Sequence, residues 1–511
     1  MNPRLPTPRP AARPSGRRAL GSAPLLIGCA LLLLLTRPAA ALPEGLTGSA
    51  ELADRLAALA QNPAFAVEEI GVSTGGTPLL AVRVSPRARM AIRHRVLFLG
   101  AQHGDEHAGK EAILSLLDDL AAGELLLPPG VELHAVPMVN PDGVDADRRR
   151  NGADFDLNRD HLLLSQPETR AVHAYAARVE PTVVVDCHEF TRDSGAYADR
   201  GWGEWPLIMM DGANSPLLPE GILELGLGWV EAAEAPMADA GFAYQRYLVG
   251  GPPPEAEIRP STLDADDARN GLSFFGGLGF IIESGVKRSA ADPQADLPER
   301  VAAYRVLLDR FLTDVERLEA TRAELARLHT EPVGPTVVTN ALWARTSPGV
   351  WEYPVVDLST GDTKLVPALN LALERVIKTQ AATPTGYAVP AAGADAYADL
   401  LEAHAVPFER LDAPRLVRAE ATKLLRVEEA FDPVHERYGG RQVVEAVPAE
   451  AVELGAGSLL VDLSALPDPL TRRRAIAVLE PRQLYGLSQW PFWREKVGGD
   501  GVLPVLRVVA E

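Results

Sequence analysis

The chain has 511 residues, of which 47% are hydrophobic, and it carries a formal net charge of −19. This length exceeds what a single hydrophobic core usually organises, so we expect two domains besides any targeting segment. The acidic balance argues against nucleic acid or an anionic membrane as a partner, and it favours solubility. Charge alone identifies no reaction.

The first 41 residues have the layout of a secretory signal peptide. Arginines are frequent up to Arg18, an apolar run follows, and Ala39–Ala41 provide the A-x-A pattern of a cleavage site. The apolar run is about 17 residues long, so an uncleaved membrane anchor is the alternative. A lipoprotein anchor at Cys29 is less favoured, because the apolar run continues beyond this residue. Removal of the segment leaves Cys187 alone, and a single cysteine cannot form an intramolecular disulfide.

From residue 44 onward, helix and strand patterns alternate. Periodicity and turn residues predict a helix over 44–62, a hairpin around Gly75 and Gly76, a strand before His103, a helix ending at Gly123, a strand before Asn140, a helix from Pro167, and strands before His188 and Glu283. This order predicts an α/β fold, a mixed central sheet with helices on both faces. The polar groups that follow the strands should gather at the carboxyl ends of the sheet.

The second half of the chain is less informative. Residues 300–329 have the pattern of one long helix with a polar face, and "TEPVGPT" after it is typical of a linker. We therefore place a first domain over 44–330 and a smaller α+β accessory domain over 335–511, in which the later pieces are short and strand-like. The accessory part contains His404 and His435 but no cluster of metal-ligand residues.

The segment "AQHGDEHAGK" contains two competing pairs of metal ligands. His103 and His107 form an H-x-x-x-H pair, which requires one helical turn, whereas His103 and Glu106 form an H-x-x-E pair across a tight loop. Because a strand runs up to His103 and Gly104 follows it, the helix should begin later, and we expect the H-x-x-E pair. A hydrolytic zinc site takes about three protein ligands and leaves one position for water. His188 in "VVVDCHEF", at the end of another buried strand, is the third candidate.

Arginines are concentrated in "RRRNGADFDLNRD", between the two halves of this metal site. Arginine binds a carboxylate through two parallel hydrogen bonds. Asn158 and Arg159 are therefore candidates for a carboxylate clamp. One of Arg148–Arg150 is a candidate for polarising a scissile carbonyl and holding its oxyanion.

Taken in order, "HGDE", "NPDG", "RRNGADFDLNRDH", "QPET" and "DCHE" resemble the zinc carboxypeptidase family related to carboxypeptidase A. The resemblance covers most of the first domain, which it marks as catalytic. It implies one zinc ion on His103, Glu106 and His188. It also implies that Asn158 and Arg159 bind the terminal carboxylate of a peptide.

Further roles follow from the same resemblance. Arg149 fits the arginine of the family's R-x-N motif, with Arg150 as the alternative, and Asp156 of "DLNR" would orient His103 from outside the metal site. Zinc lowers the pKa of a bound water, and a carboxylate takes the proton and returns it to the leaving amine. By resemblance this general base is Glu283 in "GLGFIIESG". The competing interpretation is a strand-end glutamate in a surface contact.

The sequence also departs from the family. Well-known members carry a mobile tyrosine upstream of the base, but "GGPPPEAEIRPSTLDADDARNGLSFF" contains none, and Tyr244 and Tyr247 lie further back. The substrate-closing residue and the side-chain specificity therefore stay open. Glu189 directly follows the third ligand candidate, His188. Because adjacent strand residues point to opposite faces, we expect Glu189 to point away from the zinc.

Together these features predict an exported, zinc-dependent metallocarboxypeptidase that acts on peptides with a free C-terminal carboxylate. One alternative is a zinc amidohydrolase or deacylase of the same fold, acting on cell-wall peptides or N-acyl amino acids. A second is a non-catalytic binding protein, which should lack a ligand or the base. We expect no nucleic-acid partner and no membrane contact beyond the N-terminal segment, and the oligomeric state stays open. The region 335–511 resembles C-terminal extensions of some bacterial family members.

Overall fold

The computed structural model describes residues 42–483 and 501–510, except 89, 194, 289, 346–349 and 433–436. The predicted signal peptide, residues 1–41, lies outside the described residues. Among the helices that are described, none has the combination of length and apolar character that crossing a bilayer requires.

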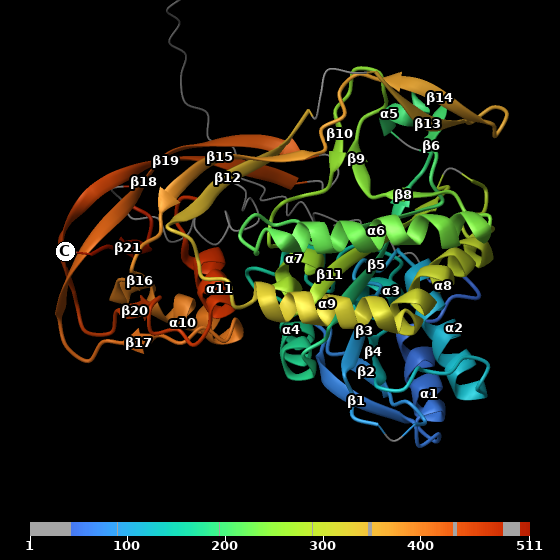
Figure 1. Cartoon of the computed structure of the whole chain (residues 1–511), viewed down its shortest axis with the longest axis horizontal. Helices are drawn as coiled ribbons and strands as arrows, with labels where there is room; N and C mark the ends of the chain where they lie inside the picture. The colour runs from blue at the N-terminus through green and yellow to red at the C-terminus, as the bar shows by residue number, and fades with distance from the viewer. Residues whose placement is uncertain are drawn as a thin grey trace, which may run out of the picture. The chain divides into compact units, whose positions relative to one another are not determined.

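An eight-stranded mixed sheet forms the centre of the structure (Figure 1). Its strands span Phe65–Val72 (β1), Pro78–Val84 (β2), His94–Gly100 (β3), Val131–Val136 (β4), Val183–Thr191 (β5), Ile208–Gly212 (β7), Tyr244–Arg246 (β8) and Leu278–Val286 (β11). They are arranged in the order β1-β2-β4-β3-β5-β11-β7-β8. The strands β4, β3, β5 and β11 run parallel, while β2 and β7 join this parallel centre in antiparallel orientation. The carboxyl ends of β3, β5 and β11 therefore lie at the same edge of the sheet.

The α-helices begin and end largely where their turn residues predict. They span Ser49–Leu59 (α1), Ala108–Ala122 (α2), Pro141–Asp145 (α3), Pro167–Val179 (α4), Gly195–Ala198 (α5), Gly221–Asp239 (α6), Ala268–Ser273 (α7), Leu297–Thr313 (α8), Val315–Leu328 (α9), Ala394–Ala403 (α10) and Pro469–Leu479 (α11). Gly123 ends α2 with a left-handed φ of 80°, a conformation that glycine adopts without steric cost. Pro167 occupies the first turn of α4, where a missing N–H costs no helical hydrogen bond.

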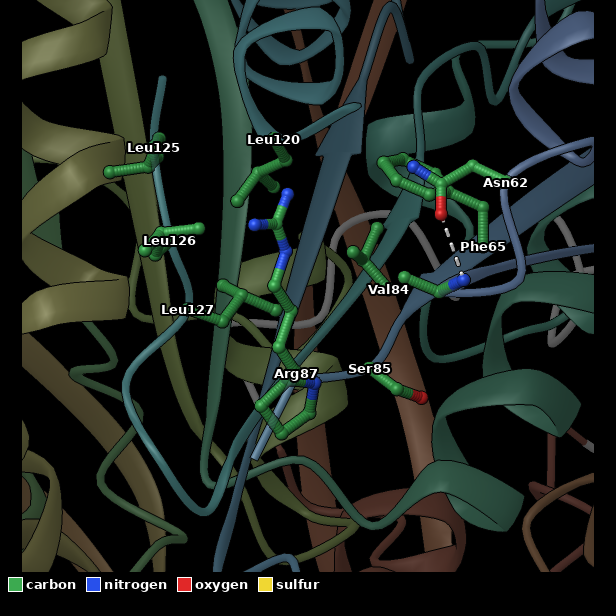
Figure 2. Close-up of a pocket in the computed structure, with 11 residues that line it drawn as sticks. Asn62, Phe65, Val84, Ser85, Arg87, Leu120, Leu125, Leu126 and Leu127 are labelled. Carbon is green, nitrogen blue, oxygen red and sulfur yellow. Dashed lines mark hydrogen bonds between the residues drawn. The ribbon is translucent and has the colours of Figure 1, made fainter. Parts of the chain in front are cut away.

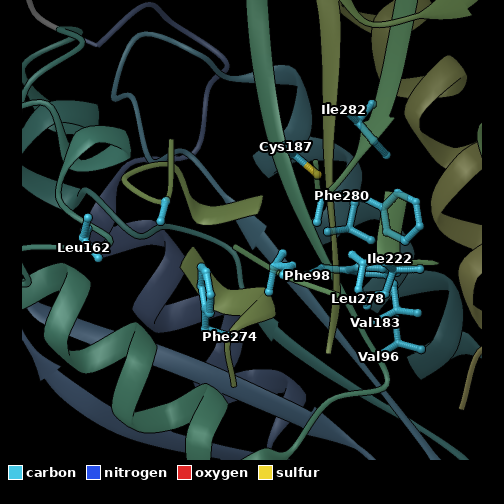
Figure 3. Packing of buried hydrophobic residues seen from close by; sticks show 14 of the residues in the cluster. Val96, Phe98, Leu162, Val183, Cys187, Ile222, Phe274, Leu278, Phe280 and Ile282 are labelled. Atoms are coloured by element: carbon cyan, nitrogen blue, oxygen red, sulfur yellow. The ribbon is translucent and has the colours of Figure 1, made fainter. Parts of the chain in front are cut away.

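Successive residues of β3 enter two different cores, one on each face of the sheet. Val96 and Phe98 pack in a core with α2, α6 and α8, whereas Leu97 and Leu99 pack in a second core with α4 and α7. Figure 3 shows the first core, in which Cys187 of β5 lies among hydrophobic side chains. Cys187 is only 1% exposed, so it acts as a small buried hydrophobe, as predicted. Helices on both faces of a mixed sheet confirm the predicted α/β fold.

The prediction of one long helix over 300–329 was wrong. Asp314 interrupts it with a non-helical backbone (φ −81°, ψ 71°), so that α8 ends at Thr313 and α9 begins at Val315. The Asp314 carboxylate accepts a hydrogen bond from the backbone N–H of Arg317 at 3.1 Å. This cap satisfies a free N–H group in the first turn of α9, which offsets the break.

The remaining strands form smaller sheets. They span Trp202–Glu204 (β6), Leu248–Gly250 (β9), Ile258–Pro260 (β10), Thr336–Ala344 (β12), Trp351–Asp357 (β13), Thr363–Ala368 (β14), Glu374–Ala382 (β15), Gly386–Val389 (β16), Glu409–Arg410 (β17), Arg415–Asp432 (β18), Arg437–Leu454 (β19), Leu459–Asp462 (β20) and Leu506–Val508 (β21). The strands β18 and β19 have 18 residues each, so the expectation of short later pieces was wrong.

The segment after residue 335 shares a sheet with the first predicted domain. The hairpin of β13 and β14 pairs through β13 with β6 in an antiparallel three-stranded sheet (Figure 1). The described residues from 42 onward belong to one compact unit. The predicted boundary between 330 and 335 stays a prediction, whereas the shared sheet was not foreseen.

Candidate metal centre and active site

The candidate residues meet at the carboxyl end of the parallel strands. His103 follows β3 after a turn at Ala101, which has a φ of 48°. His188 on β5 and Glu283 on β11 are paired in register. Residues paired in register project from the same face of a sheet, so these two side chains lie beside each other.

His103, Glu106 and His188 form a buried cluster whose ligand atoms all lie within 4.8 Å of one another. His103 Nδ1 lies 2.8 Å from Glu106 Oε1 and 3.0 Å from His188 Nδ1. His188 Nδ1 lies 2.9 Å from Glu106 Oε2. Two imidazole nitrogens and a carboxylate that converge on one point are the donor set that zinc takes in hydrolytic sites. These residues therefore fit the ion, and the predicted ligand set is confirmed.

The competing H-x-x-x-H pair does not form. His107 directly precedes α2, and its Nε2 lies 2.9 Å from Asp147 Oδ1, outside the triad. The helix thus begins too late for His103 and His107 to share one helical turn. This is the outcome that Gly104 after the strand predicted.

Each histidine ligand is held from behind by a carboxylate. His103 Nε2 lies 3.0 Å from Asp156 Oδ1, the contact expected from the "DLNR" motif. His188 Nε2 lies 2.6 Å from Asp186 Oδ2, a contact that sequence reasoning missed. Such carboxylates fix the imidazole tautomer and ring orientation, which leaves Nδ1 of both rings for the metal. The "DCH" spacing could have indicated Asp186, since residues two apart in a strand share a face.

The histidines and the Glu106 carboxylate of the triad stabilise each other's charged forms. Burial alone would lower the pKa of His188, but Asp186 and Glu106 raise it well above its ordinary value. Burial opposes ionisation of Glu106, yet His103 and His188 hold its pKa well below the usual range. Glu106 is therefore an ionised carboxylate, the form that binds a cation.

Among the three consecutive arginines, Arg149 faces the triad. Its Nη1 lies 3.4 Å from Glu106 Oε1, and its Nη2 donates to Asp156 Oδ2 at 2.9 Å. Arg150 instead donates to the carbonyl oxygen of Asp154 at 3.1 Å, within its own loop. The geometry therefore places Arg149, rather than Arg150, beside the triad.

Asn158 and Arg159 lie next to the triad. Asn158 Nδ2 lies 3.2 Å from His188 Nε2, and Asn158 Oδ1 accepts from the N–H of Ala268 at 2.9 Å. Arg159 Nη1 donates to the carbonyl oxygen of Asn158 at 2.6 Å. Burial would lower the pKa of Arg159, but Asp156 and other carboxylates raise it. Its guanidinium is therefore the fixed positive charge of the predicted clamp, and Asn158 is tied to a zinc ligand as well.

Glu283 is buried at the triad, so the interpretation as a surface contact was wrong. Burial raises its pKa to about 7 and Glu106 adds to this, while His188 and a hydrogen bond with Tyr247 act in the opposite direction. A carboxyl with a pKa near neutrality suits proton transfer in both directions. Tyr247, which the sequence left as a core candidate, lies at the site. Its distance along the chain from Glu283 concealed this contact.

Glu189 supports the ligand loop without reaching the metal position. Its backbone N–H donates to Glu106 Oε2 at 2.9 Å, while its carboxylate accepts from the N–H of His107 at 3.0 Å. The carboxylate also forms a buried ion pair with Arg300 of α8. Glu189 therefore points away from the zinc, as expected, and connects the loop to α8.

A surface pocket lies apart from this centre, near the ends of β1, β2 and α2 (Figure 2). Its lining includes Phe65, Arg87, Leu120 and Leu126, and Asn62 Oδ1 accepts from the N–H of Ala64 at 3.1 Å. It contains none of the candidate residues, so it gives no support for a second reaction site.

The pattern of the zinc carboxypeptidase family matches residues 52–192, a segment that contains the complete His103–Glu106–His188 triad. Residues 52–192 are therefore similar to the zinc carboxypeptidase family. Arg149, Asn158 and Arg159 lie in this family segment, whereas Glu283 lies beyond it.

Curated relatives of the zinc carboxypeptidase segment are similar over part of their length. Carboxypeptidase 2 of Trichophyton tonsurans is 30% identical over 202 residues, which are 37% of this chain and 36% of that protein. Carboxypeptidase SOL1 of Arabidopsis thaliana is 32% identical over 139 residues, 23% of this chain and 28% of that protein. The match thus spans about a third of the length of these relatives. A metallo-carboxypeptidase structure from Burkholderia cenocepacia is 21% identical with a TM-score of 0.41, and the match covers 52% of this chain and 69% of that one.

Proposed function

We propose that this protein is a metallocarboxypeptidase that hydrolyses the C-terminal peptide bond of peptides. The observation that carries the proposal is the placement of Glu283, in register with His188 and buried beside an intact His103–Glu106–His188 triad. A binding protein on this scaffold should lack a ligand or the base, and neither is missing. Zinc, when bound, supplies the Lewis acidity that lowers the pKa of water and polarises a carbonyl.

The residues around the triad divide the remaining tasks. Arg159 binds the terminal carboxylate of the substrate, because its guanidinium is a fixed positive charge. Arg149 donates hydrogen bonds to the scissile carbonyl oxygen as negative charge develops there. Glu283 takes a proton from the attacking water and returns it to the leaving amine. Asp156 and Asp186 hold the two imidazoles in place.

A pair of otherwise identical peptides, one a free acid and one a C-terminal amide, tests the reaction class. The amide should lose at least about tenfold in kcat/KM, because it leaves the charged clamp without its partner. Hydrolysis rates with the zinc-loaded protein, with and without a chelator, measure the effect. Equal kcat/KM for the two peptides would contradict the exopeptidase assignment and favour the amidohydrolase or deacylase alternative.

The location of the enzyme is also a proposal. The layout of residues 1–41 supports export of the chain to the periplasm or the medium, as in bacterial family members with a C-terminal extension. An uncleaved anchor and a lipid anchor at Cys29 are the alternatives. Mass spectrometry of the exported protein should show an N-terminus at Leu42, and an N-terminus that retains the apolar run would contradict cleavage.

A further inference from the structure

The row of paired residues that includes Glu283 extends toward the C-terminal part of the chain. Glu283 pairs with Met209 of β7, and Met209 pairs with Gln245 of β8. Gln245 Nε2 lies 3.5 Å from Met209 Sδ and donates to the hydroxyl of Tyr353 at 3.1 Å. Tyr353 belongs to β13, so the segment after residue 335 contributes a side chain to the row that contains the general base.

The strand β6 carries Glu204 into the same neighbourhood. Glu204 pairs with Val355 of β13, and its N–H donates to the carbonyl oxygen of Arg192 at 2.8 Å. The N–H of Arg192 in turn donates to Val286 at the end of β11 at 2.9 Å. Two backbone hydrogen bonds thus connect Glu204 to the strand that carries Glu283. The negative charge of Glu283 raises the pKa of the Glu204 carboxyl.

The Glu204 carboxylate forms no hydrogen bond or ion pair with any residue that the structure describes. The nearby guanidinium of Arg192 donates instead to the backbone carbonyls of Glu204 and Trp205, at 3.2 and 2.9 Å. Burial raises the pKa of Glu204 to about 8, Glu283 adds to the shift, and Arg192 offsets only part of it. Arg192 therefore compensates the half-buried Glu204 carboxylate only in part, and an external cation would offset the remaining cost of its burial.

Two tyrosines form the surroundings of this carboxylate. Tyr197 and Tyr353 are hydrogen-bonded to each other. The charge of Glu204 raises the pKa of both hydroxyls. Tyr197 also donates to the carbonyl oxygen of Gly251 at 3.4 Å. Both rings pack in a hydrophobic cluster with Val355, which fixes β13 against the β6 strand. Aromatic rings beside a carboxylate suit the aliphatic stem and charged head of a lysine or arginine side chain.

We propose that Glu204 binds a positively charged side chain of the substrate next to the scissile bond, and that the β13–β14 hairpin positions Glu204 for this role through Tyr353. The inference rests on the proposed carboxypeptidase function and names the substrate class of the same site. It also gives the segment 335–511 a task, since β13 pairs with the strand β6 that carries Glu204.

Two pairs of peptides test this inference. One pair differs by lysine or norleucine at the C-terminal position, and the other pair has the same difference at the penultimate position. Norleucine retains the aliphatic chain and lacks the ammonium group. We expect the zinc-loaded protein to favour lysine roughly tenfold or more in kcat/KM at one of these positions.

Glu204→Gln should bring the lysine-to-norleucine ratio to about one, because the amide has no charge for the ammonium group. Tyr353→Phe should lower the ratio in part, mainly through KM, since it removes the hydrogen bond between Tyr353 and Gln245 that positions β13. Glu352→Gln, a change at the exposed neighbour on β13, should retain the wild-type ratio. The thermal midpoint of each variant shows that it is folded.

The outcomes separate the two proposals. A wild-type ratio near one at both positions, in an active enzyme, would overturn the role of Glu204 and leave the carboxypeptidase assignment intact. A protein that hydrolyses none of the peptides would contradict the proposed function. Calorimetric binding of the same peptide pairs would then still show whether Glu204 selects the positive charge.

Discussion

Replacing Glu283 with glutamine should lower kcat by roughly 10²- to 10⁴-fold, the range of a lost general base. Glutamine has nearly the same shape and still forms hydrogen bonds, but it cannot take a proton from water. The triad should stay intact in this variant, because Glu283 forms no hydrogen bond with His103, Glu106 or His188 among the residues that the structure describes, and glutamine has nearly the same volume. Zinc content should therefore match that of the wild type. KM should change less than kcat, since the clamp at Arg159 is untouched.

Steady-state kinetics on a free-acid peptide, together with metal analysis of the same sample, checks this result. Glu69→Gln, at an exposed position of β1, is the matched control and should leave kcat and zinc content as they are. Equal kcat in the wild type and in Glu283→Gln, at equal zinc content, would show that the proton passes through another group.

The pH profile of kcat/KM should report the ionisation of Glu283. The base must be ionised, so activity is present above its pKa and is lost as the pH falls through it. Burial sets the pKa of Glu283 to about 7, and a bound cation lowers it. We therefore expect the acid limb at or below about pH 7, and its absence in Glu283→Gln.

Replacing Arg300 with methionine should reduce the free energy of unfolding by about 3–5 kcal/mol, the cost of leaving one partner of a buried ion pair alone. Arg300 and Glu189 are both almost fully buried, and Arg300 also binds Asp296 at 2.9 Å and the side chain of Gln294 at 2.9 Å. Without the arginine, burial and the nearby Glu106 carboxylate would raise the already raised pKa of Glu189 further. The loss should therefore be smaller at acidic pH, where Glu189 takes up a proton.

Denaturant unfolding of both proteins at neutral and acidic pH measures this difference. Arg310→Met is the matched control, because Arg310 lies on the same helix α8 and forms a half-exposed pair with Asp314 at 2.9 Å. We expect at most about 1 kcal/mol for this control. Similar losses in the two variants would mean that the Glu189–Arg300 pair contributes no more than a surface pair.

Local patterns were sufficient for the centre of the fold and for the metal ligands. The buried strands are apolar runs that end in turn residues, and the parallel order of such strands brings their ends together. His103, Glu106 and His188 follow from this rule and from Gly104. Arg149 was preferred over its neighbours by motif, and the geometry then placed it at the triad.

The tertiary structure decided what depends on partners far away in the chain. The periodicity of 300–329 continues through Asp314, and only the cap on Arg317 shows that the helix breaks there. Tyr247 directly follows β8, which lies two strands from β11 in the sheet, and no spacing in the sequence reveals that this brings it to Glu283.

The pairing of β6 with β13 also depends on residues far apart in the chain. β6 has three residues and β13 follows it far along the chain, so no local pattern predicts their pairing. Sequence alone determines which segments are strands and which side chains can bind a metal, because these properties depend on neighbouring residues. Which strands become neighbours depends on how all the apolar faces are buried together, and that brought Tyr353 and Glu204 to the proposed active site.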